Sequence, residues 1–90
     1  MIDIQGFSEY LKNNRKYPNS VVLKYVAVIR KVVDSGGFES VLMTMGPDEL
    51  AVMTIGHPLT KSMRYTHWRP GIKRYREFVE WSERQERMKL

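Results

Sequence analysis

Apolar residues recur along this chain at spacings of three and four, the period that places them on one face of a helix. Phe7, Tyr10 and Leu11 form the first such stripe. The sequence NNRKYP ends it, because Asn is a poor helix former and Pro18 disfavours a helical conformation in the residue before it. The pattern predicts a first helix over about residues 7–14.

The longest stripe follows Pro18, a residue that suits a first helical turn, with Asn19 or Ser20 as its cap. Many of its apolar residues are β-branched, which leaves a strand as the alternative. The length, the helical spacing and the stop at DSGG favour a helix, because Gly36 and Gly37 are typical of a C-terminal cap. The apolar positions of this stripe are Val22, Tyr25, Val26, Ile29, Val32 and Val33.

The middle of the chain is less regular. FESVLMTM predicts either a short helix or an extended connector in which residues 41–43 fill the core. GPDELAVM is typical of a helix start, with Pro47 in the first position and two acidic residues beside the positive end of the helix dipole. TIGHP should end this helix.

The last segment begins near Leu59, with Thr60 as a plausible cap. Pro70 inside a helix costs about 3 kcal/mol, and Gly71 weakens the helix further. We therefore expect either a kink at Pro70 or a break there, and favour a break between a short element at about residues 60–67 and a long helix that starts at Pro70. Glu80–Arg84 and Glu83–Arg87 are predicted ion pairs along that helix.

These elements predict an all-α fold, a small bundle of four to five helices in one domain over residues 1–90. The predicted core comprises Phe7, Leu11, Tyr25, Ile29, Leu50, Ile72, Tyr75 and Phe78. The chain has no cysteine, no signal-peptide pattern and no apolar run long enough to span a bilayer, so a cytoplasmic protein is expected.

Charge is distributed unevenly along the chain, which carries a net charge of +5. Residues 1–60 sum to zero, residues 61–76 carry +6 without an acid, and residues 77–90 carry −1. Such a basic run is typical of a protein that binds a polyanion, although a solvated helix face can have the same composition.

The stretch RYTHWRPGIKRYREFVEW divides at Pro70. After Pro70, Tyr75, Phe78 and Trp81 repeat at helical spacing, which favours core positions. Before it, basic and aromatic residues are nearly consecutive, so some of them must face solvent or a partner. Trp68 is the exception, because it lies four residues before Ile72 and suits a core anchor.

Catalytic chemistry is hard to build from this sequence. His57 and His67 lack metal-ligand spacing, and there is no nucleophile motif, GxGxxG or P-loop. We therefore expect no enzyme activity, no metal, no cofactor and no small-molecule substrate.

Several segments together resemble the N-terminal core-binding domain of tyrosine recombinases, the phage-integrase family. They are SEYLKNN, YPNSVVLKYVAVIRKVV, PDELAVM and GIKRYREFVEW, and the resemblance covers about residues 5–83. It implies a SAM-like helical bundle that clamps duplex DNA. The chain departs from the family pattern at Pro18, Val21 and Pro70–Gly71, and it lacks the catalytic domain, so DNA binding without cleavage is implied.

The family contacts DNA through the N-terminal parts of its second and last helices. Together with the charge map, this predicts a DNA-binding set of Asn19, Ser20, Lys24, Lys61, Arg64, Arg69 and Lys73. A recombinase catalytic domain or another protein is a further possible partner, and no membrane partner is expected.

Two other classes of function stay open. A protein-interaction or oligomerisation module would use adaptable methionines, of which Met43, Met45, Met53 and Met63 are the candidates, although filling gaps in the core is their more usual role. Binding of RNA or a single strand would use stacking on Tyr65 and Trp68.

Overall fold

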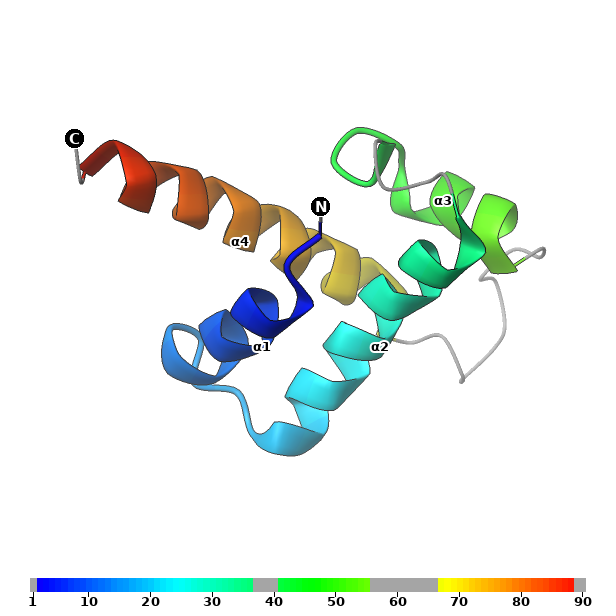
Figure 1. Ribbon diagram of the computed structural model, residues 1–90. Coiled ribbons are helices and arrows are strands. Elements are labelled where there is room, and N and C mark those ends of the chain that lie inside the picture. Colours follow the sequence, from blue (N-terminus) through cyan, green and yellow to red (C-terminus); the bar gives the residue numbers. More distant parts are fainter. Residues whose placement is uncertain (1, 37–40, 56–66, 89–90) are drawn as a thin grey trace.

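The computed structural model describes residues 2–36, 41–55 and 67–88, which form four helices (Figure 1). These are α1 (Ile4–Asn13), α2 (Asn19–Ser35), α3 (Pro47–Ile55) and α4 (Trp68–Met88). Helix α4 crosses α2, α1 packs against both, and α3 packs where the second half of α2 approaches the start of α4. No strand occurs in these three ranges, so the predicted all-α bundle is confirmed.

Helix α1 starts three residues earlier than the apolar stripe predicts. Asp3 caps it, because its carboxylate accepts a hydrogen bond from the backbone N–H of Gly6 over 2.8 Å. A side chain in place of Gly6 would crowd this cap, since a Cβ at that position would meet the Asp3 carboxylate, which would have to shift. A periodicity search misses this first turn because its residues add little to the stripe.

Helix α2 begins after Pro18, which occupies the cap position itself. The prediction that Asn19 or Ser20 caps this helix was wrong, since both residues lie in its first turn. At the other end Gly36 has φ of +74°, a conformation that glycine adopts without strain, as the sequence predicted.

Residues 41–45 form hydrogen-bonded turns, so this part of the segment is not the extended connector, whereas residues 38–40 of the predicted short helix lie outside the described residues. The N–H groups of Thr44 and Met45 both donate to the carbonyl of Val41. Leu42 fills the core as expected and Val41 is partly buried, whereas Met43 is exposed, contrary to prediction.

Helix α4 begins at Trp68 without a break at Pro70, so the predicted start at Pro70 was wrong by two residues. Pro70 lies in the first turn, where a backbone N–H has no partner within the helix, so its missing N–H costs little. Gly71 faces α2, where an added Cβ would lie 3.1 Å from Cβ of Val28, and its small size lets the two helices approach. The predicted element at about 60–67 falls almost wholly outside the described residues.

The core lies where α1, α2 and α4 meet, and α3 closes one end. Seven of the eight predicted core residues are buried, whereas Tyr25 packs against the core while partly exposed. Trp68 is buried, as its spacing from Ile72 predicted. The ring of Phe7 contacts those of Tyr75 and Phe78 at centroid distances of 5.3 and 5.8 Å.

Candidate nucleic-acid interface

Residues 61–76 were predicted to supply most of the binding surface, and four of their six basic residues are described. Lys61 and Arg64 lie outside the described residues. Arg69 lies in the first turn of α4 and reaches the start of α3, where its Nε and Nη2 donate to the two carboxylate oxygens of Asp48 over 2.5 and 2.8 Å. These hydrogen bonds raise the pKa of Arg69 and lower that of Asp48. The predicted phosphate ligand Arg69 is therefore already paired.

Arg74 and Arg76 form hydrogen bonds with acceptors in other parts of the chain as well as within α4. Arg74 donates through Nη1 to both carboxylate oxygens of Glu77 over 2.8 Å and through Nε to the hydroxyl of Tyr17 over 2.9 Å. Arg76 donates to two backbone carbonyls of the 41–45 turns, over 3.0 Å to that of Leu42 and also to that of Met45. Both arginines thus donate hydrogen bonds to acceptors of the same chain.

Lys73 is the remaining described member of this run. Its side chain is exposed and makes no ion pair or hydrogen bond within the described part of the chain. Lys73 and Arg69 are four residues apart and so share one side of α4. The C-terminal basic run, which we define as residues 61–76, therefore offers one unpaired cation among its described members.

Helix α2 presents the other predicted residues. Asn19, Ser20 and Lys24 are exposed on its N-terminal half. The side chain of Pro18 has no hydrogen-bond acceptor and so cannot cap the helix. The backbone N–H groups of Asn19 and Ser20 make no hydrogen bond in the described ranges. Two free backbone donors, two polar side chains and a lysine thus lie within the first two turns, at the positive end, of a helix of 17 residues.

A second basic run, residues 10–33, surrounds this helix start and was missed because the charge was summed over residues 1–60. It contains six basic residues and no acid, as many as the C-terminal basic run. All six are exposed, and only Arg15 has a partner in the described structure. A sliding count of acid-free stretches would have found this N-terminal basic run, whose members are Lys12, Arg15, Lys16, Lys24, Arg30 and Lys31.

Aromatic rings extend this surface towards α4. The rings of Tyr17 and Tyr25 pack edge to face at 5.6 Å, and Tyr25 packs against His67 at 5.9 Å. Arg15 lies 5.8 Å from the centroid of the Tyr17 ring and donates to its hydroxyl over 3.4 Å. Burial opposes ionisation of Tyr17, but the hydrogen bonds from Arg15 and Arg74 outweigh it and lower its pKa. Sequence periodicity gave no signal for this cluster, because its members come from three separate segments.

Trp68 is unavailable for stacking on a base. The residue is 1% exposed, and its Nε1 donates to the carbonyl of Pro47 over 2.7 Å. The prediction that Trp68 stacks with single strands was therefore wrong, and Tyr65, its proposed partner, lies outside the described residues.

The ion pairs of the structure differ from those predicted along α4. Glu80–Arg84 and Glu83–Arg87 form no ion pair, and the ion pairs within the described ranges are Arg69–Asp48 and Arg74–Glu77. Within the same ranges no three metal-ligating side chains lie close enough together to hold an ion. None of the helices there has the length and apolar character of a membrane span.

Comparisons with models of protein families, with curated proteins and with solved structures find nothing that matches this chain. The resemblance to the core-binding domain of tyrosine recombinases therefore stays a prediction from the sequence.

Proposed function

We propose that this chain is a non-catalytic module that binds duplex DNA through the phosphate backbone, with the N-terminal half of α2 as the centre of contact. The observation that carries the proposal is that the first two turns of α2 hold free backbone donors, exposed polar side chains and an unpaired lysine. Asn19 and Ser20 offer backbone and side-chain donors, and Lys24 follows one turn later on the exposed side. Phosphate oxygens are the acceptors that suit this combination.

The charge on α2 continues beyond its first turn. Lys24 and Lys31 are seven residues apart and lie on the same side of the helix, with Ala27 between them. All three are exposed, so a row of cations separated by a small residue faces solvent. Such a row can follow a phosphate backbone without steric obstruction, which supports binding that depends weakly on sequence.

The proposed interface is centred on α2 and not on the C-terminal basic run, where the net charge of the sequence first placed it. Arg69 is bound to Asp48, while Lys73 stays available at the edge of the surface. Arg15 and Lys16 precede α2 directly and add positive charge beside its first turn. The DNA contacts that we propose are those of Asn19, Ser20 and Lys24, with Arg15, Lys16 and Lys31 as added phosphate ligands and Lys73 at the edge.

The salt dependence of binding tests this assignment. Each phosphate contact on B-DNA adds about 0.9 to the magnitude of the slope of log K against log salt. Replacing Lys24 and Lys31 together by Gln should therefore reduce that slope by about 1.8 and weaken binding to all duplexes alike. The measurement is fluorescence anisotropy of a labelled random-sequence duplex over a series of salt concentrations.

Arg84→Gln with Arg87→Gln is the matched control, since it also removes two exposed positive charges from a helix surface. This control should change the slope by less than about 0.5. Equal slopes for the two double variants would mean that α2 is not the interface. Binding to a single strand or to RNA that is tighter than binding to the duplex would reject the duplex assignment.

A protein-interaction module is the second candidate, and exposed apolar side chains favour it. Val52 and Met53 on α3 are 47% and 55% exposed, and Met43 in the neighbouring turns is 36% exposed. Of the other two candidate methionines, Met45 is partly buried and Met63 lies outside the described residues. A domain that shows no salt-dependent binding to DNA but associates with itself in light scattering would support this second function.

A further inference from the structure

An exposed leucine lies on the side of α2 that carries its free lysines. Leu23 is 68% exposed, and Ala27, about one turn further along the helix, is exposed as well. The other three helices pack against other sides of α2, so these two side chains face away from the described core (Figure 1). Single leucines are common on protein surfaces, so the meaning of this one depends on its surroundings.

Cations lie on both sides of this apolar pair. Successive residues of an α-helix are turned by about 100°, and the order around the exposed side of α2 is therefore Arg30, Leu23, Ala27, Lys31 and Lys24. The three cations are exposed and have no ion-pair or hydrogen-bond partner in the described ranges. The exposed side of α2 thus has an apolar middle between two positively charged edges.

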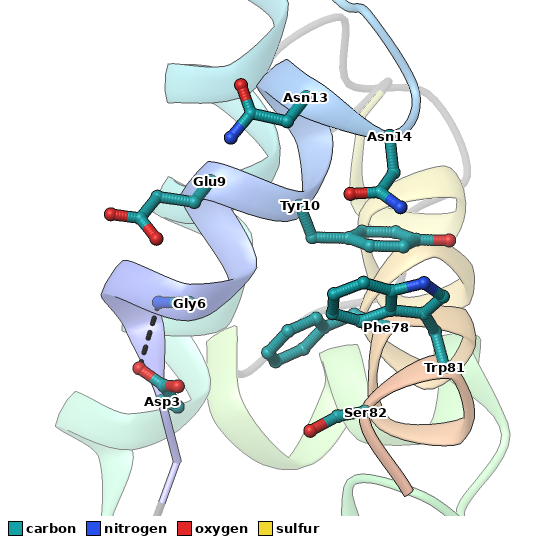
Figure 2. Close-up of a pocket in the computed structure, with 9 residues that line it drawn as sticks. All are labelled: Asp3, Gly6, Glu9, Tyr10, Asn13, Asn14, Phe78, Trp81 and Ser82. Atoms are coloured by element: carbon teal, nitrogen blue, oxygen red, sulfur yellow. Dashed lines mark hydrogen bonds between the residues drawn. The ribbon is translucent and has the colours of Figure 1, made fainter. Parts of the chain in front are cut away.

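The edge of this surface next to α1 has a further cation. Leu23 lines two neighbouring hollows between α1 and α2, and Lys12 of α1 lines both of them. Arg30 lines the larger hollow as well. Glu9 is the acid among these lining residues, and its side chain projects from α1 away from Trp81 (Figure 2). Two cations therefore accompany one carboxylate beside Leu23, and the net charge there is positive.

This arrangement suits a helix that lies in the major groove of duplex DNA. The groove is about 12 Å wide and admits one α-helix, so the two edges of the helix meet the phosphate backbones and its middle faces the base pairs. The apolar group that base pairs present in this groove is the C5-methyl of thymine. An apolar middle between basic edges matches that distribution of charge and methyl groups.

We propose that Leu23 and Ala27 contact thymine methyl groups in the major groove and give the domain a preference for A·T base pairs. This inference rests on the proposed function, because it places bases against the middle of a surface whose cations bind the backbone. Lys24 and Lys31 follow one strand, and Arg30 follows the other. The preference is modest, since burial of one methyl group is worth about fourfold in affinity.

The test compares a labelled A·T-rich duplex with the same duplex in which uracil replaces every thymine, a change that removes only the C5-methyl groups. Fluorescence anisotropy at one salt concentration gives both Kd values. We expect the Kd of the uracil duplex to be about two- to tenfold higher. In a G·C-rich duplex, 5-methylcytosine in place of cytosine adds a methyl group at the same position of the groove and should lower the Kd.

Leu23→Ser is the variant that tests the methyl contact, and Met53→Ser is its matched control, since Met53 is a 55% exposed apolar residue on α3. Leu23→Ser should lower the ratio of the uracil and thymine Kd values by at least about half. It should leave the slope of log K against log salt unchanged, because it removes no charge. Met53→Ser should keep both the ratio and the slope of wild type.

The outcomes separate this inference from the proposed function. Equal Kd values for the thymine and uracil duplexes, with binding that still weakens as salt rises, would overturn the methyl contact and leave backbone binding intact. A Kd ratio that Leu23→Ser does not lower would mean that another residue makes the contact. Absence of salt-dependent binding to every duplex would overturn both. Self-association that Leu23→Ser abolishes in light scattering, without a thymine preference, would place Leu23 in an interface between copies of this chain.

Discussion

The two basic runs of this chain have the same charge and opposite structural roles. The N-terminal basic run and the C-terminal basic run each carry +6 without an acid. In the first, every side chain faces solvent and five of six have no partner within the described structure. In the second, the three described arginines donate to a carboxylate or to backbone carbonyls of the same chain. Charge counted along a sequence therefore does not measure the charge that a partner meets.

The difference arises from where each run lies in the fold. Helix α4 passes both α3 and the 41–45 turns, so long side chains on it reach acceptors that belong to other segments. The exposed side of α2 faces no other helix in the described ranges, and its lysine side chains have no hydrogen-bond or ion-pair partner there. Arginine also suits the internal role, because its five donors can satisfy several fixed oxygens at once.

The largest expected effect concerns stability and compares one arginine from each run. Arg76→Met leaves the carbonyls of Leu42 and Met45 without their donor at a partly buried position. We expect it to lower the free energy of unfolding by about 1–3 kcal/mol, measured by urea denaturation. Arg30→Met, at an exposed position without a partner in the described ranges, should change it by less than about 0.5 kcal/mol. Similar losses for both variants would contradict the comparison.

The sequence predicted the scaffold well because core periodicity depends on local spacing. The stripe from Phe7 to Leu11, the start of α3 at Pro47 and the burial of Trp68 all follow from spacing and turn chemistry. The partners of Arg69 and Arg76 could not be predicted, because Asp48 lies 21 residues away and Leu42 lies 34 residues away along the chain. Only the fold shows that these arginines are occupied and that Lys24 is not.

An intermediate effect, on the salt dependence of DNA binding, is expected from a variant that frees the guanidinium of Arg69 in the C-terminal basic run. Asp48→Asn removes the carboxylate that holds Arg69, so the guanidinium becomes available to a phosphate. If Arg69 lies within reach of bound DNA, the slope of log K against log salt should steepen by up to about 0.9. The control is Glu49→Gln, which removes a neighbouring exposed charge without releasing an arginine. An equal change in both variants would show that only net charge matters, and no change in either would place Arg69 outside the interface.

The smallest expected effect is the pH dependence of the Arg69–Asp48 pair, whose side chains are 60% and 63% exposed. The hydrogen bonds from Arg69 lower the pKa of Asp48 below its ordinary value of 3.8. The pair therefore stabilises the fold above that value, and the stabilisation is lost as the pH falls through the lowered pKa of the folded state. We expect the melting temperature of wild type to lie slightly above that of Asp48→Asn at about pH 6, and the difference to vanish in stronger acid.

Thermal unfolding followed by circular dichroism measures this difference in melting temperature, which should also shrink at high salt because exposed charges are screened. Asp34→Asn serves as the comparison, since Asp34 is exposed and makes no ion pair within the described ranges. A wild-type advantage over Asp48→Asn that is constant across this pH range would show that the pair contributes through packing and not through charge.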